Sequence, residues 1–141
     1  MNEQNNVLVC VTPQESSKNL IAAGKALAEK SDAQLQVITV LPLNGETQKD
    51  WPQMLDSLFQ SVQNAKGEMA VYFSDDPDLT IAAHMAKTKP LLLVVGFPGE
   101  NSNNFISLIH LLVPETPISM VDKDRRIYNM LPFEENRSVH H

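Results

Sequence analysis

Apolar residues along this chain form two patterns, and the two patterns alternate. Short continuous apolar runs, typical of strands buried on both faces, occur five times. These runs span residues 7–11, 35–41, 69–73, 91–95 and 117–121. The fourth run, LLLVV, is the most apolar of the five and therefore predicts the central strand of a sheet.

The segments between the runs predict four helices, because their apolar residues recur at helical spacing. The predicted helices follow the cap Ser16-Ser17, run from Trp51 to Gly67, run from Asp76 to Pro90, and span about 105–112. The opening of the third helix is clearest, since Asp75-Asp76-Pro77-Asp78 places an acidic cap before a first-turn proline. Regular alternation of strands and helices predicts an α/β domain. We expect a five-stranded, mostly parallel sheet with helices on both faces.

Length and charge narrow the class of protein. With 141 residues the chain fits one domain, predicted over 1–121, followed by a charged C-terminal tail over 122–141. The formal charge of −6 argues against a nucleic-acid partner, which would require clustered Lys and Arg. Apolar runs are too short to cross a membrane, and the polar first residues do not resemble a secretory signal. The single cysteine, Cys10, cannot form an internal disulfide, so we expect a cytoplasmic protein.

Residues that could carry chemistry do not form a catalytic pattern in the sequence. His84 and His110 lie on predicted helices without a second ligand at helical spacing, so we expect no metal site. Cys10 falls within a buried strand and is expected to be an inert thiol. Ser16 and Ser17 lack the glycines that surround a nucleophilic serine. The sequence therefore predicts that the protein is not an enzyme.

Three segments of the chain form a recognisable set: NVLVCVTPQESSKNLIAAGKALAEKSDAQLQVITV, DDPDLTIAAHMAKTKPLLLVVG and Gly96-Phe97-Pro98-Gly99. Together they resemble the universal stress protein family. The resemblance covers about residues 6–121. The first predicted strand of the chain and the loop after it are also similar to the stress-protein-like domain of potassium-sensing histidine kinases. It implies the UspA-like, adenine-nucleotide-binding α-hydrolase-like fold. It also implies a stress response and a ligand pocket at the carboxyl ends of the strands.

The chain departs from the family at two of the positions that bind ATP in family members. The family places a nucleotide-binding aspartate after the first strand, where this chain has Val11-Thr12-Pro13-Gln14. The family's phosphate motif, Gly-x-x-Gly, continues nine residues later with Gly-Ser or Gly-Thr, but here those positions are Ile109-His110. No glycine follows Gly99, and the predicted helix over 105–112 occupies the stretch that a phosphate loop would need. We therefore expect a degenerate ATP site and no resident cofactor.

The resemblance leaves three functional hypotheses. In the first, the chain is a non-enzymatic module that acts through homodimerisation, because similar family members dimerise through their last strand. The edge would then be formed by Pro117, Ile118, Ser119, Met120 and Val121.

The second hypothesis is a sensor of a small ligand or of an adenine nucleotide such as ATP or AMP. Its pocket would lie at the carboxyl ends of the strands. The candidate contacts are Thr12, Pro13, Val40, Leu41, Gly96 and Gly99. The third and weakest hypothesis is nucleotide hydrolysis, which would need a metal and a positioned water.

Overall fold

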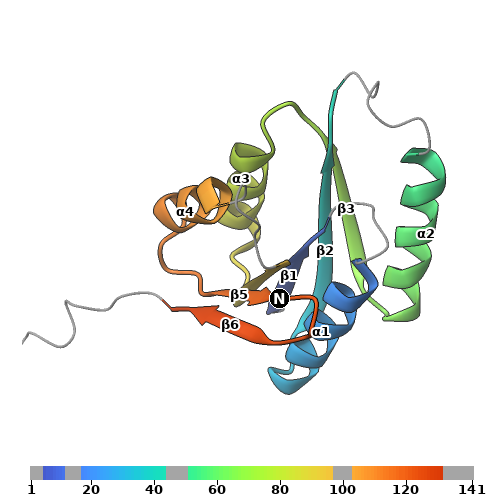
Figure 1. Cartoon of the computed structure of the whole chain (residues 1–141), viewed down its shortest axis with the longest axis horizontal. Coiled ribbons are helices and arrows are strands. Elements are labelled where there is room, and N and C mark those ends of the chain that lie inside the picture. The colour runs from blue at the N-terminus through green and yellow to red at the C-terminus, as the bar shows by residue number, and fades with distance from the viewer. Residues whose placement is uncertain (1–4, 12–16, 44–50, 97–102, 132–141) are drawn as a thin grey trace, which may run out of the picture.

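The computed structural model describes residues 5–11, 17–43, 51–96 and 103–131 (Figure 1). Its strands are β1 Asn6–Cys10, β2 Gln34–Leu41, β3 Glu68–Phe73, β4 Leu92–Gly96, β5 Ile118–Val121 and β6 Ile127–Met130. Its helices are α1 Ser17–Lys30, α2 Trp51–Asn64, α3 Pro77–Thr88 and α4 Asn103–Leu112. The predicted α/β fold is confirmed, and each predicted strand and helix is found within a few residues of its expected position. Within the described residues, no helix has the length and apolar character needed to span a bilayer.

The six strands form one sheet in the order β3-β2-β1-β4-β5-β6. Strands β1 to β5 run parallel, and β6 pairs antiparallel with β5. The apolar run at 91–95 becomes β4, which lies beside β1 at the centre of the sheet, as predicted. Parallel strands in this position are buried on both faces, which explains why both runs lack alternation.

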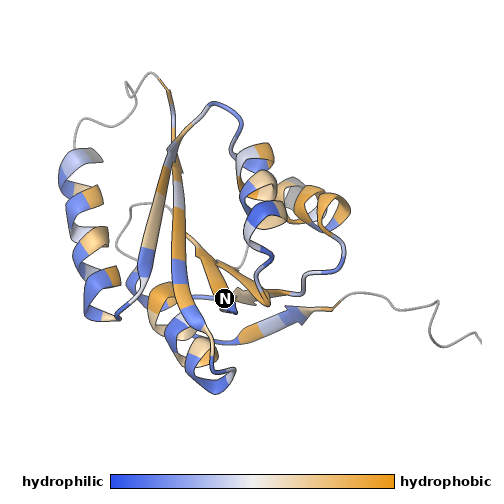
Figure 2. Ribbon diagram, turned by 180° about the vertical axis from the view of Figure 1, so that it is seen from behind, coloured by the Kyte–Doolittle hydropathy of each residue, from blue (hydrophilic) through white to orange (hydrophobic). Residues whose placement is uncertain are grey.

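Each face of the sheet has its own hydrophobic cluster. Helices α1 and α2 pack on one face, where Val7, Val9, Val37 and Val94 meet Ile21 and Leu58. Helices α3 and α4 pack on the other face, where Leu8, Ile38 and Leu93 meet Met85 and Ile109. Figure 1 shows the two pairs of helices on opposite sides of the sheet, and Figure 2 shows apolar residues concentrated on the central strands.

Local signals in the sequence set the ends of α3. The side chain of Asp76 accepts a hydrogen bond from the backbone N–H of Leu79 at 3.4 Å, and Pro77 opens the first turn. Lys89 ends the helix in the left-handed conformation, with its N–H donating to the Met85 carbonyl at 2.7 Å. The predicted acidic cap is therefore confirmed.

The sheet has six strands rather than the predicted five, and this corrects two expectations. Residues 127–130 were predicted within the charged tail, yet they form β6. The predicted dimer edge, 117–121, is not an edge, because β4 pairs with one side of β5 and β6 pairs with the other. Asp122 causes the difference by building a tight turn: its Oδ1 accepts from the N–H of Asp124 at 2.9 Å and of Arg126 at 2.8 Å.

Candidate functional site

The strand order places a topological switch point at the carboxyl ends of β1 and β4. From β1 the chain proceeds outward through β2 and β3, and from β4 it proceeds outward in the opposite direction through β5. In open α/β sheets, ligands bind outside the carboxyl ends of the strands at such a switch point. The candidate site therefore lies beyond Cys10, the last residue of β1, and Gly96, the last residue of β4.

The four described helices begin toward this edge of the sheet, because each of them follows the carboxyl end of a parallel strand. Helix α1 follows β1, α2 follows β2, α3 follows β3 and α4 follows β4. Helix amino termini carry partial positive charge and free N–H groups, so this edge is the more favourable one for an anion. Asp78 lies in the first turn of α3, and its negative charge helps to raise the pKa of the Cys10 thiol.

Cys10 itself is held as a neutral thiol. Burial, and to a smaller extent the negative charge of Asp78, raises the pKa of Cys10 to about 12. Nucleophilic cysteines have lowered pKa values, because the thiolate is the reactive form. The structure therefore supports the predicted inert thiol at the end of β1.

Gly96 differs from the other glycines that the structure describes. Its φ lies outside the left-handed region, and an added Cβ would meet only Leu20 Cδ1, at an ordinary distance of 3.6 Å among the described residues. At Gly24 the added Cβ would overlap Val9 Cγ2, and at Gly67 it would approach Leu35 Cδ2 to 2.9 Å. Packing therefore requires Gly24 and Gly67, whereas no described residue packs closely enough against Gly96 to require a glycine there.

The remaining predicted contacts divide into three groups. Val40 is half-buried at the end of β2, on the α3/α4 face of the sheet. Leu41 is buried, so its side chain belongs to the core. Thr12, Pro13 and Gly99 lie outside the described residues.

Sequence reasoning missed two polar groups near this edge. One is Asp78, which was interpreted only as a helix-capping acid. The other is Thr39, whose Oγ1 is fully buried and has no hydrogen-bond partner within the described part of the chain. No pattern in the sequence distinguishes Thr39 from its apolar neighbours in β2, because threonine is as compatible with a buried strand as valine.

His84 lies away from this edge, and both of its ring nitrogens have hydrogen-bond partners. The carboxamide oxygen of Gln36 can only accept, so His84 donates from Nε2 to Gln36 Oε1 at 3.0 Å. Its Nδ1 then accepts from the Tyr72 hydroxyl at 2.9 Å, with the two rings in an edge-on arrangement. Burial lowers the pKa of His84, and the nearby Lys87 lowers it further. The histidine is therefore a neutral structural group in the α3/α4 core.

No three metal-ligating side chains gather anywhere in the described ranges. His110 lies on α4 and His84 lies on α3.

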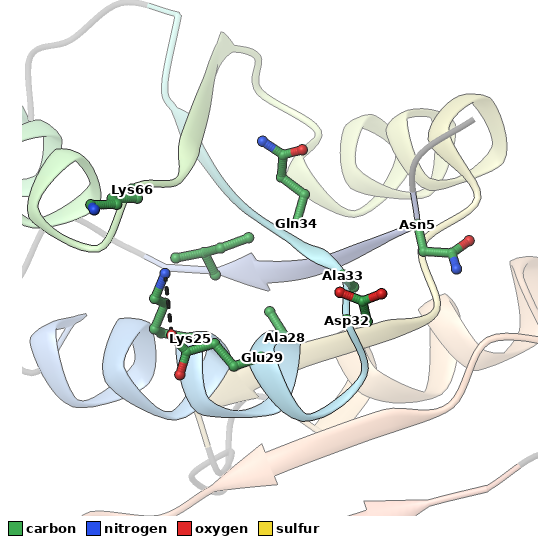
Figure 3. Close-up of a pocket in the computed structure, with 9 residues that line it drawn as sticks. Asn5, Lys25, Ala28, Glu29, Asp32, Ala33, Gln34 and Lys66 are labelled. Carbon is green, nitrogen blue, oxygen red and sulfur yellow. Dashed lines mark ion pairs between the residues drawn. The ribbon is translucent and has the colours of Figure 1, made fainter. Parts of the chain in front are cut away.

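A second concave region lies at the opposite, amino-terminal edge of the sheet (Figure 3). It is an open depression of about 520 Å³ between the ends of α1 and α2. Its lining consists of Asn5, Lys25, Ala28, Glu29, Asp32, Ala33, Gln34, Leu35 and Lys66. Lys25 and Glu29 pair with one another at 3.6 Å, so part of its charge is neutralised internally. It lies at the edge opposite to the one where parallel sheets of this kind bind ligands.

Comparison with known proteins identifies the fold. No protein-family model matches the chain, and no curated sequence is significantly similar to it. Solved structures of universal stress proteins do match. A universal stress protein in complex with cAMP aligns with a TM-score of 0.58 and 17% identity, covering 84% of this chain and 97% of that one.

Two archaeal structures agree with this result. A universal stress protein from Archaeoglobus fulgidus aligns with a TM-score of 0.61 and 15% identity, over 81% of this chain and 90% of that one. Another from the same organism, in complex with dAMP, aligns with a TM-score of 0.60 and 13% identity, over 83% and 97%. The chain therefore has the universal-stress-protein fold that its sequence resemblance implied.

Proposed function

We propose that this chain is a non-enzymatic binding module that holds a small adenine nucleotide at the carboxyl edge of β1 and β4. The observation that carries the proposal is Gly96, a glycine at the switch point that no close contact with the described residues requires. A glycine is favoured where a ligand approaches the backbone closely, because it has no side chain to block the approach. Two structures with the same fold, bound to cAMP and dAMP, support an adenine nucleotide as the ligand.

The expected ligand carries a short phosphate chain rather than a triphosphate. Helix α4 spans Asn103–Leu112, and Ile109 in it is fully buried against the α3/α4 cluster. Ile109-His110 are the positions at which the family's phosphate motif would continue, and here Ile109 belongs to the core. A nucleoside monophosphate needs fewer contacts than ATP, which is consistent with an edge that lacks this half of the motif.

The proposal is non-enzymatic because the candidate reactive groups are committed to other roles. The Cys10 thiol is held protonated, since burial and the charge of Asp78 raise its pKa to about 12. Both ring nitrogens of His84 are hydrogen-bonded, to Tyr72 and Gln36. We expect AMP or cAMP to be recovered unchanged after prolonged incubation with the protein, as measured by chromatography of the nucleotide.

Calorimetric titration with AMP, cAMP and ATP tests the binding site, with GMP as the control for the base. We expect AMP and cAMP to bind, and ATP to bind no more tightly than AMP. Saturation at 100 times the dissociation constant should raise the free energy of unfolding by about 2.7 kcal/mol. Gly96→Ala should weaken AMP binding roughly tenfold or more, because the methyl group would occupy the approach to the backbone.

Lys25→Ala, in the amino-edge depression, is the matched control and should leave AMP binding unchanged. Loss of binding in Lys25→Ala with normal binding in Gly96→Ala would move the site to the depression. Absence of heat with every adenine nucleotide at millimolar concentration would refute the proposed function.

A further inference from the structure

The turn between β5 and β6 gathers positive charge at the carboxyl edge of the sheet (Figure 1). Residues 122–126 form this turn, and their sequence is DKDRR. Three of the eleven basic residues of the chain, Lys123, Arg125 and Arg126, therefore lie within four consecutive positions. All three are exposed, and none of them forms an ion pair with another described residue. In a chain with a formal charge of −6, the turn is a local excess of unpaired cations.

The register of the sheet places this turn beside the switch point. Gly96 is paired with Val121 across β4 and β5, so the turn begins one residue beyond the level of Gly96. Neighbouring strands lie about 4.8 Å apart. An extended arginine side chain is longer than this spacing, so the cations of the turn can reach a ligand group that lies over Gly96. The turn and the candidate site are therefore neighbours at the same edge.

The charges at this edge are separated to its two sides. The acids Asp75, Asp76 and Asp78 follow β3, whereas the cations follow β5. The switch point lies between them, because β1 and β4 are at the centre of the strand order. The charge of Asp78 acts on Cys10 at the end of β1, where it helps to raise the pKa of the thiol. An anionic group at the switch point is therefore repelled from the β1 side and attracted toward the β5 side.

Arg125 has a backbone conformation that usually favours glycine. Its φ is 69°, in the left-handed region, and its N–H donates to the Asp122 carbonyl at 2.9 Å to close the turn. Two other lysines in the described ranges share this conformation, Lys66 and Lys89, but both follow helices, whose carboxyl ends favour positive charge. Arg125 lies between two strands, so that reason does not apply to it. A strained residue without a structural reason for its identity indicates a functional one.

We propose that Arg125 and Arg126, together with Lys123, bind the phosphate of the nucleotide and make the site selective for a terminal phosphate monoester. This inference rests on the proposed function. A phosphate monoester carries a charge of about −1.5 to −2 at pH 7, whereas a cyclic phosphodiester carries a single charge and adenosine carries none. The arginine guanidinium presents paired N–H donors that match two phosphate oxygens.

The net charge of the turn suits one phosphate group rather than a triphosphate. The carboxylates of Asp122 and Asp124 offset two of the three cations, which leaves the turn with a formal charge of +1. The Asp122 carboxylate is also committed to the turn, because its Oδ1 accepts from the N–H of Asp124 at 2.9 Å and of Arg126 at 2.8 Å. The carboxylate therefore holds the backbone that presents the two arginines.

Calorimetric titration of the full chain with adenosine, AMP and cAMP tests the inference. We expect AMP to bind roughly tenfold more tightly than adenosine, with cAMP between them. The double variant R125Q/R126Q should weaken AMP binding roughly tenfold or more and leave adenosine binding unchanged. Raising the NaCl concentration from 50 mM to 500 mM should weaken AMP binding to the parent chain and should affect the double variant less, because salt screens exposed charges.

Arg125→Gly separates the loss of binding from a failure to fold. Glycine adopts the left-handed conformation without strain, so this variant should unfold at a higher urea concentration than the parent chain. It should nevertheless bind AMP roughly fivefold more weakly. Lys66→Gly is the matched control, because it relieves a left-handed lysine at the amino-terminal edge of the sheet. It should also raise the urea midpoint, but it should leave AMP binding unchanged.

The possible results distinguish this inference from the proposed function. Equal affinities of the parent chain for AMP and adenosine would overturn the inference and leave adenine binding intact. Preferential AMP binding that R125Q/R126Q does not weaken would also overturn it, because other groups would then hold the phosphate. The same is true of equal weakening by Arg125→Gly and Lys66→Gly. Absence of binding by adenosine and AMP alike would refute the proposed function and this inference together.

Discussion

The two faces of the sheet are packed by helices in different ways. Helix α1 approaches the sheet through apolar side chains and a glycine, so closely that Gly24 lies directly against Val9. Helix α3 approaches through apolar side chains and also through His84, which is hydrogen-bonded to Tyr72 and Gln36. One face therefore depends on shape alone, whereas the other also depends on a protonation state.

The difference matters because the two kinds of packing fail under different conditions. Close apolar packing is sensitive to volume and is indifferent to pH in the range where the protein is folded. A buried, neutral histidine is sensitive to both the loss of a partner and the uptake of a proton. Variants on each face should therefore separate a steric response from a polar response.

The largest effect is expected from Gly24→Ala on the α1/α2 face. An added Cβ would overlap Val9 Cγ2, in a fully buried strand that cannot move aside. Overpacking of this kind costs about 1–3 kcal/mol, so a net loss of up to about 2 kcal/mol remains after the gain of about 1 kcal/mol in helix propensity from replacing glycine by alanine. Urea denaturation followed by circular dichroism should show the loss.

Gly96→Ala is the control and should change stability by less than about 0.5 kcal/mol, since its Cβ meets only an ordinary contact. Equal losses in the two variants would contradict the close approach of α1.

Tyr72→Phe on the α3/α4 face should have a smaller effect. The change removes the hydroxyl that donates to His84 Nδ1 at 2.9 Å and leaves that nitrogen unpaired at a site only 6% exposed. An unsatisfied buried acceptor of this kind costs about 1 kcal/mol or somewhat more. The same denaturation assay measures it.

Tyr128→Phe is the matched control, because the Tyr128 side chain is 40% exposed and its hydroxyl donates to Asp122 over a longer distance of 3.4 Å. Its expected cost is below about 0.5 kcal/mol. A cost for Tyr72→Phe as small as that of the control would show that the polar network contributes nothing to this face.

Features that depend on neighbouring residues along the chain could be predicted from the sequence. Buried runs such as LLLVV at β4 predict strands directly, since a strand covered on both faces has no polar side. The acidic cap and proline of α3 predict a helix start, because they satisfy local backbone groups. The central order of the sheet follows from these local rules.

Features that depend on distant residues could not be predicted. Gln36, Tyr72 and His84 are separated by up to 48 positions along the chain, and only the folded sheet brings them together. Strand β6 was missed because Asn129 is unfavourable in strands and the segment lies in a charged tail. Its turn was encoded locally in Asp122, which could have indicated a hairpin.

For the candidate site, sequence reasoning placed Gly96 correctly at the end of β4 but also included Leu41, which is buried. Strand ends are readable from the sequence, because glycine and proline follow the apolar runs. The direction of each side chain at the end of a strand depends on register, which the sequence does not specify there.

The smallest expected effect is a pH dependence of stability that originates on the α3/α4 face. The ordinary pKa of histidine is 6.5, and burial followed by the charge of Lys87 lowers the pKa of His84 in the folded protein. Above pH 6.5 the histidine is neutral in both states and contributes no pH dependence. Below pH 6.5 the unfolded chain binds a proton that the folded protein does not, so the free energy of unfolding falls. The fall continues until the pH reaches the lowered folded pKa, below which both states are protonated.

Urea titrations between pH 7.5 and pH 5 should therefore show a decline for the parent chain that His84→Gln removes. Lys87→Gln should make the decline shallower, because it removes the second cause of the lowered pKa while leaving burial in place. Gly24→Ala should lower stability by the same amount at every pH in this range, since the α1/α2 face contains no titrating group in its cluster. An unchanged slope in His84→Gln would assign the pH dependence to another group, and the two faces would then differ in packing alone.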